Sequence, residues 1–207
     1  MATAVKICGI TRIEDGVCAA HCGAHAIGLV FYGPSPRHVD PVAAGAIIRA
    51  LPPFVMSVGL FVDAPPEKVR ETIAAAPVQL LQFHGAESPA YCRSFGLPYV
   101  KAVRVGAGVD LVQCSRDYSD AKGLLLDALV VGLHGGTGAS FDWSLIPSAL
   151  PLPVILSGGL DPANVGQAVR RVRPWAVDVS SGVEAAKGIK DPAKIAAFIA
   201  GVRNADV

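Results

Sequence analysis

The chain has 207 residues, of which 52% are hydrophobic and 17% are charged, and its 18 Lys and Arg nearly balance its 17 Asp and Glu. This composition excludes intrinsic disorder and supplies enough apolar side chains for a full core. A net charge of +1 without a basic tract argues against nucleic-acid binding, which depends on many phosphate contacts. No segment approaches the roughly 20 apolar residues that cross a bilayer, and the first residues contain no secretory signal. We therefore expect a cytoplasmic protein that binds neither nucleic acid nor a membrane.

Eight short apolar segments recur along the chain. They are mostly continuous rather than alternating, which is typical of parallel strands buried on both faces. These segments are residues 4–8, 26–31, 56–62, 78–83, 99–104, 123–127, 154–157 and 175–180. Eight of them in 207 residues leave about 26 residues for each strand with its following helix, which is compact for a barrel of this kind.

The segments between these strands contain helix signals. Asp161 and Asp191 are each followed by a proline, as at a helix N-cap, and residues 65–70 open with two prolines and an acid. The helix signal is weakest in the fifth connection, where residues 109–118 must supply the helix. We predict one (β/α)8 TIM-barrel domain over residues 1–207. An open doubly wound sheet fits less well, since eight repeats with a terminal helix are what barrel closure requires.

The five cysteines follow no disulfide spacing and are expected to be reduced. Cys18, His21, Cys22 and His25 fall at helical i, i+3, i+4 and i+7 offsets, as in a zinc site on one helix. Structural zinc sites usually draw their ligands from two separate elements, however. Ordinary helix packing is therefore the interpretation we favour, and we predict no metal site.

In such barrels the active site lies at the C-terminal ends of the strands. Cys8 and Asp127 end the first and sixth strands and are a candidate base and acid, because proton transfer needs two groups that flank the substrate. Taken singly, such a Cys is usually a small buried side chain and such an Asp a turn cap. Lys6 projects to the same side as Cys8. It could stabilise a thiolate there or pair with Asp178 inside the barrel, and the sequence leaves both roles open.

Glycine and serine follow the seventh and eighth strands, where these barrels commonly bind phosphate. Gly158 and Gly159 follow one strand, and Ser180, Ser181 and Gly182 follow the next. Glycines let backbone N–H groups approach an anion, and a short helix from Gly182 onward would point its N-terminus at it. One Gly-Gly pair alone would indicate only a turn, but two sites at consecutive strands favour phosphate binding. Residues 135–138 form a further Gly-rich loop, a weaker signal for a lid or an additional donor.

Taken together and in order, the motifs at these strand ends resemble those of the phosphoribosylanthranilate isomerase family, over nearly the whole chain. They are Lys6-Ile7-Cys8-Gly9-Ile10-Thr11, Ser35-Pro36-Arg37, Gln82-Phe83-His84-Gly85, Asp127 with Gly135-Gly136-Thr137-Gly138, Ser157-Gly158-Gly159 and Asp178-Val179-Ser180-Ser181-Gly182.

The resemblance implies the Amadori rearrangement of N-(5-phosphoribosyl)anthranilate to 1-(2-carboxyphenylamino)-1-deoxyribulose 5-phosphate in tryptophan biosynthesis, without a cofactor. It implies Cys8 as the general base, Asp127 as the general acid, and Arg37 as the partner of the anthranilate carboxylate. Further candidate substrate ligands are His84, Arg104 and Asp178. Residues 106–122 and 129–134 match no quoted motif. The expected partner is a phosphorylated small molecule, and both a monomer and a homodimer remain open.

Three alternatives compete with this interpretation. A histidine-pathway isomerase would use an Asp where Cys8 stands and would have a second phosphate site in the first half of the chain. A dual-specificity enzyme is disfavoured for the same reasons. A non-catalytic barrel that binds a phosphorylated ligand would keep the glycines and lose the acid and the base, and both are present.

Overall fold

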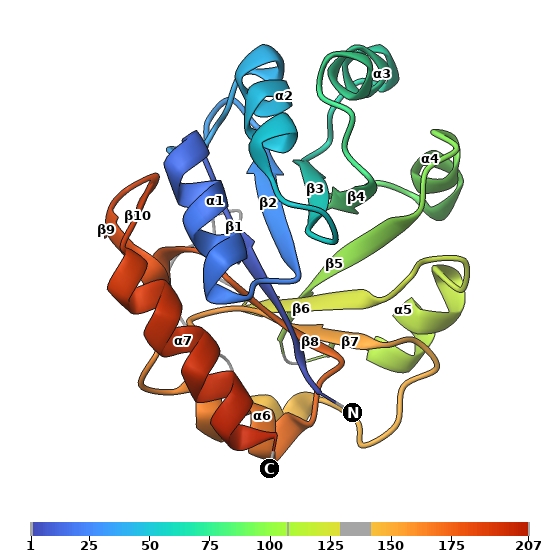
Figure 1. Cartoon of the computed structure of the whole chain (residues 1–207). Helices are drawn as coiled ribbons and strands as arrows, with labels where there is room; N and C mark the ends of the chain where they lie inside the picture. Colours follow the sequence, from blue (N-terminus) through green and yellow to red (C-terminus); the bar gives the residue numbers. More distant parts are fainter. Residues whose placement is uncertain (1, 107, 129–141, 207) are drawn as a thin grey trace.

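Eight parallel strands form a closed barrel in chain order, and helices cover its outside (Figure 1). The computed structural model describes residues 2–106, 108–128 and 142–206. The strands are β1 (Ala4–Cys8), β2 (Ala26–Val30), β3 (Met56–Phe61), β4 (Leu80–Phe83), β5 (Tyr99–Val105), β6 (Leu124–Ala128), β7 (Val154–Leu156) and β8 (Ala176–Val179). Their ends lie within two residues of the expected segments, so the predicted (β/α)8 barrel is confirmed.

The described ranges contain seven α-helices: α1 (Ile13–Cys22), α2 (Pro41–Ala50), α3 (Pro66–Ala75), α4 (Pro89–Arg93), α5 (Leu111–Asp117), α6 (Val165–Val172) and α7 (Pro192–Ala205). The helix expected in the fifth connection is present as α5. Asp191 caps α7 as predicted, because its carboxylate accepts hydrogen bonds from the N–H groups of Ala193 at 2.8 Å and Lys194 at 3.2 Å.

The helix start predicted at Asp161 is wrong. Helix α6 begins only at Val165, with Asn164 as its N-cap residue. The Asp161 carboxylate instead accepts hydrogen bonds from the N–H groups of Ala163 and Asn164, at 2.8 and 3.0 Å, within a turn. The Asp-Pro pair therefore closes a turn before the helix.

Two connections near the end of the chain differ from a simple strand–helix repeat. Between β6 and β7, the described residues 142–153 contain one 3₁₀ helix, η1 (Trp143–Leu145), while the expectations for residues 129–134 and 135–138 lie outside the described residues. After β8, the short helix expected from Gly182 onward is also wrong. A 3₁₀ helix, η2 (Ser181–Val183), is followed by a hairpin of β9 (Glu184–Ala186) and β10 (Ile189–Lys190). The extended backbone at Glu184 lets its carboxylate reach the buried guanidinium of Arg37.

The core fills the layer between the strands and the helices. Ile7, Ile27 and Leu81 on the strands and Phe198 on α7 are fully buried in it. Because helices cover one face of each strand and barrel side chains cover the other, the strands are apolar along most of their length, as their sequences indicated. No helix in the described ranges is both long and apolar enough to cross a bilayer.

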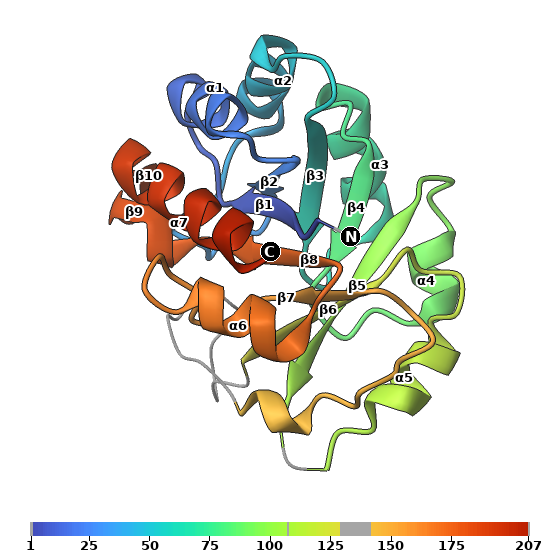
Figure 2. The ribbon, with the colours of Figure 1, turned by 60° about the horizontal axis from the view of Figure 1, so that its bottom comes forward.

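The two ends of the described chain meet at the N-terminal end of the barrel, and the N and C labels lie close together in Figures 1 and 2. The N–H and hydroxyl groups of Thr3 donate hydrogen bonds to the Asp206 carboxylate, at 2.7 and 2.6 Å. The ends of the chain therefore lie opposite the end of the barrel that carries the polar residues described next.

Candidate active site

A pocket opens at the C-terminal ends of the strands, where the sequence predicted it. Most of the predicted side chains line it, together with an apolar patch from β2 and β3. The full lining is Cys8, Val30, Tyr32, Ser35, Arg37, Leu60, Val62, Gln82, His84, Asp127, Ser157, Asp178 and Ser180. The structure therefore brings together Cys8, Arg37, His84, Asp127 and Asp178, which the sequence spreads over 171 positions.

Cys8 lies at the end of β1, beside a buried ion pair. Lys6 donates a hydrogen bond to Asp178 at 2.8 Å, and both side chains are buried. Burial lowers the pKa of Lys6, but attraction to Asp178 and Cys8 outweighs this and leaves the pKa raised, so Lys6 stays charged. Burial raises the pKa of the Cys8 thiol, and the Lys6 ammonium opposes this effect without cancelling it. The two roles left open for Lys6 are thus compatible.

Gly28 on β2 makes room for this arrangement. A Cβ atom at Gly28 would lie 2.7 Å from the Cys8 Sγ and 2.9 Å from the Lys6 Nζ. Any larger residue would displace the sulfur or the ammonium. The glycine inside β2 therefore allows the thiol and the ammonium to approach each other.

Asp127 ends β6 and accepts hydrogen bonds on both oxygens. The Oδ1 atom accepts from the N–H of Ala128 at 2.9 Å, and Oδ2 lies 3.1 Å from Nε2 of His84. The other ring nitrogen of His84 lies 3.0 Å from the amide nitrogen of Gln82. Gln82, His84 and Asp127 thus form a buried chain across β4 and β6, and in this structure His84 contacts protein groups through both nitrogens.

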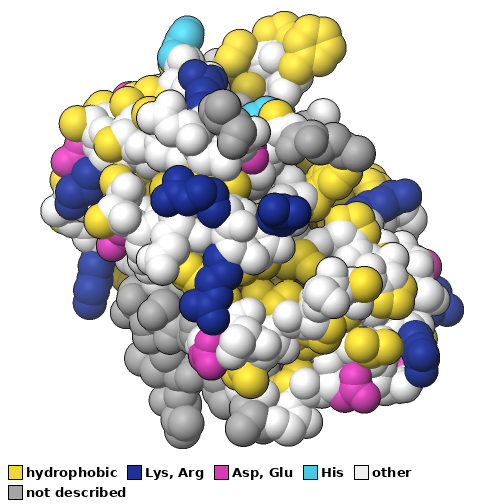
Figure 3. Space-filling model, turned by 90° about the horizontal axis from the view of Figure 1, so that it is seen from below, with side chains coloured by type: hydrophobic (Ala, Val, Ile, Leu, Met, Phe, Trp, Pro, Cys, Tyr) yellow, Lys and Arg dark blue, Asp and Glu magenta, His cyan; other side chains and the backbone are white. Residues whose placement is uncertain are grey.

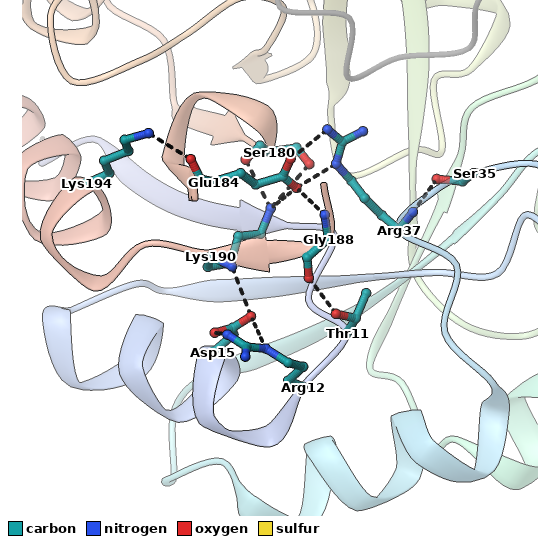
Figure 4. A network of polar contacts seen from close by, with 10 residues as sticks. All are labelled: Thr11, Arg12, Asp15, Ser35, Arg37, Ser180, Glu184, Gly188, Lys190 and Lys194. Atoms are coloured by element: carbon teal, nitrogen blue, oxygen red, sulfur yellow. Dashed lines mark hydrogen bonds and ion pairs between the residues drawn. The ribbon is translucent and has the colours of Figure 1, made fainter. Parts of the chain in front are cut away.

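Arg37 follows β2 and is held by Glu184 of β9. Its Nε and Nη2 atoms donate to the two Glu184 oxygens, at 2.7 and 2.9 Å, and its backbone N–H donates to the hydroxyl of Ser35. Figure 4 shows the Arg37 and Lys190 side chains converging on Glu184. The bidentate contact fixes the guanidinium plane. Nη1 has no partner among the described residues, so this edge of the side chain is open toward the pocket.

The cluster of Arg37, Glu184 and Lys190 holds two cations and one carboxylate. Burial alone would raise the pKa of Glu184, but its hydrogen bond with Arg37 and the charge of Lys190 hold it below the usual value. Burial lowers the pKa of Lys190, and attraction to Glu184 offsets only part of this. Lys190 also donates to the carbonyl of Ser180 at 3.0 Å. The surplus positive charge beside β8 favours an anionic ligand.

The predicted phosphate loops pack against each other after β7 and β8. Gly158 and Gly159 have φ angles of +84° and +64°, which favour glycine. A Cβ atom at Gly182 would lie 2.0 Å from the carbonyl oxygen of Leu160, so only glycine fits there. Among the described residues, the backbone N–H groups of Gly158, Gly159, Ser181 and Gly182 donate to no acceptor. Four unpaired donors in adjacent loops are suited to an anion.

Arg104 is a predicted ligand outside the pocket lining, which also lacks the loop residues Gly158, Gly159, Ser181 and Gly182. It is half-buried and stands opposite Asp127 in the pairing of β5 with β6, but it is not part of the pocket lining. Within the described ranges it has no hydrogen bond or ion pair. Its contact with a substrate stays a prediction.

The two histidines of the predicted cysteine–histidine cluster contact backbone groups. His21 contacts the carbonyl of Val17 at 2.9 Å, and His25 accepts from the N–H of Val5 at 3.1 Å, each through its Nδ1 atom. In the part of the chain that the structure describes, no group of three or more His, Cys, Asp or Glu side chains is arranged to hold a metal, and the five cysteines are free.

Comparison with known proteins decides the family. The family model described as N-(5′-phosphoribosyl)anthranilate (PRA) isomerase matches residues 5–201. The chain belongs to this family. It is 62% identical over 199 residues to N-(5′-phosphoribosyl)anthranilate isomerase of Thiobacillus denitrificans, a match that covers 96% of this chain and 97% of the relative. The resemblance and the function expected from it, an isomerase of tryptophan biosynthesis, are confirmed.

Solved structures of the family agree in fold. The crystal structure of phosphoribosyl anthranilate isomerase from Thermotoga maritima has a TM-score of 0.89 at 41% identity, over 98% of this chain and 99% of that chain. Another family structure, in complex with reduced 1-(o-carboxyphenylamino)-1-deoxyribulose 5-phosphate, has a TM-score of 0.86 at 40% identity with the same coverage.

Sequence reasoning missed three residues at this isomerase site. Gln82 could have been found, because it lies two positions before His84 and so points to the same side of β4. Glu184 and Lys190 lie within stretches of the sequence that resemble the family, but no local pattern assigned them a role. Arg37 and Glu184 are 147 positions apart, and the hairpin that carries Glu184 was expected to be a helix.

Proposed function

We propose that this isomerase performs the Amadori rearrangement with Cys8 as the base and Asp127 as the acid. The observation that carries the proposal is that these two side chains, from β1 and β6, line one pocket together with Arg37 and Ser180. No step of this reaction requires a cofactor, because the isomerisation is internal to the substrate.

In the first step, Asp127 donates a proton to the ribose ring oxygen. The C1′–O bond breaks, and the nitrogen lone pair forms a C1′=N bond, which gives a protonated Schiff base. A carboxyl group at this position must hold its proton until the substrate is bound. The hydrogen bonds from Ala128 and to His84 fix its orientation.

In the second step, the Cys8 thiolate removes the proton from C2′. The electrons of the C2′–H bond form a C1′=C2′ double bond, and those of the C1′=N bond return to nitrogen as a lone pair. The resulting enolamine tautomerises to the ketone, as C1′ gains a proton and the C2′ hydroxyl loses its proton to form the C2′=O bond. Lys6 supports this step because its ammonium favours the thiolate, against the effect of burial on the pKa of Cys8.

The two charged ends of the substrate have separate binding groups in this proposal. Arg37, held flat by Glu184, binds the anthranilate carboxylate through its open edge. The N–H groups of Gly158, Gly159, Ser181 and Gly182, with the Ser180 hydroxyl beside Lys190, bind the phosphate.

The remaining predicted ligands have different roles. The Oδ2 atom of Asp178 has no partner among the described residues and is suited to accept a hydrogen bond from a ribose hydroxyl. Arg104 is free to contact the substrate. We assign His84 to the support of Asp127 rather than to the substrate, since both its nitrogens have protein partners.

Loss of phosphoribosylanthranilate fluorescence under steady-state conditions tests the function directly. Cys8→Ala and Asp127→Asn should each lose about 10²–10⁴-fold in kcat, while they keep their fold and bind a product analogue. Turnover of a histidine-pathway aminoaldose, or binding without turnover in the unmodified enzyme, would favour one of the alternatives. Near-normal kcat in either variant would show that its residue is misassigned.

The proposal also covers location and assembly. We place the enzyme in the cytoplasm, as a homodimer. Phe54, in the loop before β3, is 103% exposed at a φ of +69°. At the same end of the barrel, hydrophobic residues such as Ile146 and Leu152 line a groove beside Arg170 and Arg173. Figure 3 shows this mixture of hydrophobic and basic side chains on the lower face. Two copies can pair symmetrically if Phe54 of each copy enters this groove on the other copy.

A further inference from the structure

The acid Asp127 is connected to a buried amide by a chain of two contacts. Gln82 lies on β4 and His84 directly follows this strand, and neither is exposed to an appreciable extent. The Gln82 side chain has one partner in the described part of the chain, which is Nδ1 of His84 at 3.0 Å. Its carbonyl oxygen, Oε1, is buried without a partner. An unpaired buried carbonyl is uncommon and calls for a physical explanation.

The orientation of this amide determines the tautomer of His84. With the Gln82 nitrogen facing Nδ1, as here, the ring accepts at Nδ1 and carries its proton on Nε2. The Nε2–H group then donates to Asp127 Oδ2 across 3.1 Å. Asp127 also accepts from the Ala128 N–H, so the amide orientation seen here corresponds to an unprotonated carboxylate.

The opposite orientation corresponds to the protonated acid. If the amide turns by half a rotation, Oε1 faces His84 and accepts a hydrogen bond from Nδ1–H. The lone pair of Nε2 then accepts the proton of a neutral Asp127. Among the residues that the structure describes, no other hydrogen bond holds the amide, so one of its two polar atoms is unpaired in either orientation. Neither orientation is therefore favoured by the number of bonds that it makes.

We propose that Gln82, through His84, controls whether Asp127 carries the proton that it donates to the substrate. Oε1 faces the ring while Asp127 is protonated. The amide nitrogen faces the ring after Asp127 has given its proton to the substrate. Gln82 and His84 are positioning residues in this scheme, because neither touches the reacting atoms. The inference rests on the proposed role of Asp127 and deepens it.

Other charged and titratable groups face the same pocket and bear on its pH dependence. Cys8 lies on β1, Arg37 and Tyr32 follow β2, Arg104 stands beside Asp127 on β5, and Asp178 on β8 is paired with Lys6. A pH profile of the rate therefore reports on all of these groups together, and not on His84 or Asp127 alone. The tautomer of the His84 ring must therefore be measured directly, in addition to the rate.

Two substitutions at Gln82 separate the orientations. In Gln82→Glu, the side chain can only accept a hydrogen bond from Nδ1, so Asp127 should stay protonated. Gln82→Met keeps the length of the side chain but has no strong acceptor, so it should favour the unprotonated form of Asp127. The two variants should therefore differ in kcat at neutral pH. In Gln82→Met, kcat at neutral pH should fall about tenfold or more with little change in KM.

Nitrogen NMR of protein labelled at the histidine rings reads the tautomer. The His84 signals are assigned by their loss in His84→Gln, and the exposed His21→Gln serves as the matched control. In the unmodified enzyme the neutral His84 ring should be in the Nδ1–H form while Asp127 is protonated and in the Nε2–H form while Asp127 is ionised. In Gln82→Glu, the His84 ring should retain the Nδ1–H form over a wider pH range than in the unmodified enzyme.

The outcomes separate this inference from the proposed function. If Asp127→Asn keeps its activity, Asp127 is not the acid and the proposed mechanism fails first. If Asp127→Asn is inactive while His84 keeps one tautomer at every pH, only the control by Gln82 is wrong. Equal effects of both Gln82 variants on kcat would also overturn it. Should Gln82→Met fail to fold, the NMR measurement on the unmodified enzyme still decides.

Discussion

Lys6 and Asp178 form an ion pair at 2.8 Å between the first and the last strand of the barrel. They are register partners in the pairing of β1 with β8, so the pair lies across the seam at which the barrel closes. The same ammonium lies against the sulfur of Cys8. One buried cation thus serves closure of the barrel and the environment of the base.

Removal of this cation should therefore affect both stability and activity. Lys6→Met leaves the Asp178 carboxylate buried without its partner, which should cost about 3–5 kcal/mol in the free energy of unfolding, measured with urea. The double variant Lys6→Met/Asp178→Leu removes both charges and should recover most of the stability. It should not recover the activity, because Cys8 still lacks its cation and the substrate lacks the Asp178 carboxylate. Full activity in the double variant would exclude a role of Lys6 in catalysis.

The pH dependence of kcat/KM should reflect the thiol of Cys8. Burial raises its pKa, and the base acts as the thiolate, so activity should still be rising above about pH 8.5, where an ordinary thiol is half ionised. Lys6→Met removes the opposing influence of the ammonium and should move this rise to higher pH. A rate profile from about pH 6 to about pH 10 checks both expectations. A rise that is complete near neutral pH would contradict the assignment of the base.

Glu184→Gln should weaken both the fold and the binding of substrate. It leaves Arg37 and Lys190 buried with a poorer partner, which should cost about 3 kcal/mol at neutral pH, and KM should rise because the guanidinium is no longer held. The pKa of Glu184 is lowered in the folded protein, so the ionised carboxylate stabilises the fold above about pH 4.3 and less as the pH falls through its folded value.

Urea unfolding at several pH values checks this prediction. The difference between the unmodified protein and Glu184→Gln should narrow below about pH 4.3, as the carboxylate of the unmodified protein becomes protonated. Glu14→Gln, in an exposed pair with Arg12, is the control and should change stability by less than about 1 kcal/mol. A difference that is constant with pH would mean that the charge of Glu184 is not what holds Arg37.

Gly182→Ala tests the phosphate loops. The added Cβ atom would meet the carbonyl of Leu160, so the two loops must separate and their N–H groups must move. Inorganic phosphate should bind at least about tenfold more weakly, measured by calorimetry or by competitive inhibition. Gly166→Ala, on the neighbouring α6, meets nothing closer than 3.5 Å and is the matched control. Unchanged phosphate affinity in Gly182→Ala would place the anion elsewhere.

Phe54→Asn tests the homodimer. Asparagine tolerates a positive φ, so the loop should keep its conformation while the aromatic side chain is removed. Sedimentation should then show a monomer, with the barrel still folded. If the unmodified protein itself sediments as a monomer at micromolar concentration, the proposed assembly is wrong.

The sequence was sufficient to predict the barrel, because its strands are local signals. Each is a short apolar run, and the strand ends alone placed Cys8, Arg37, His84, Asp127 and Asp178 at one end of the fold. The predictions were wrong where one local sequence pattern is compatible with two different structures. Asp161-Pro162 can cap a helix or close a turn, and the structure has the turn.

The partners of the site residues were harder to predict than the residues themselves. A glutamate in a three-residue strand has no periodic pattern, and its bond to Arg37 depends on tertiary packing alone. His84 was expected to bind substrate because the sequence could not show that Gln82 and Asp127 occupy both of its ring nitrogens.

The hydrogen bonds between Thr3 and Asp206 have a practical consequence for protein engineering. A short linker could join the two ends of the chain, and a new opening could be made in an exposed loop elsewhere on the barrel. Because the junction lies at the end remote from the pocket, such a circular permutant should keep the arrangement of Cys8 and Asp127. The order in which the strands are synthesised could then be varied in a protein whose chemistry stays the same.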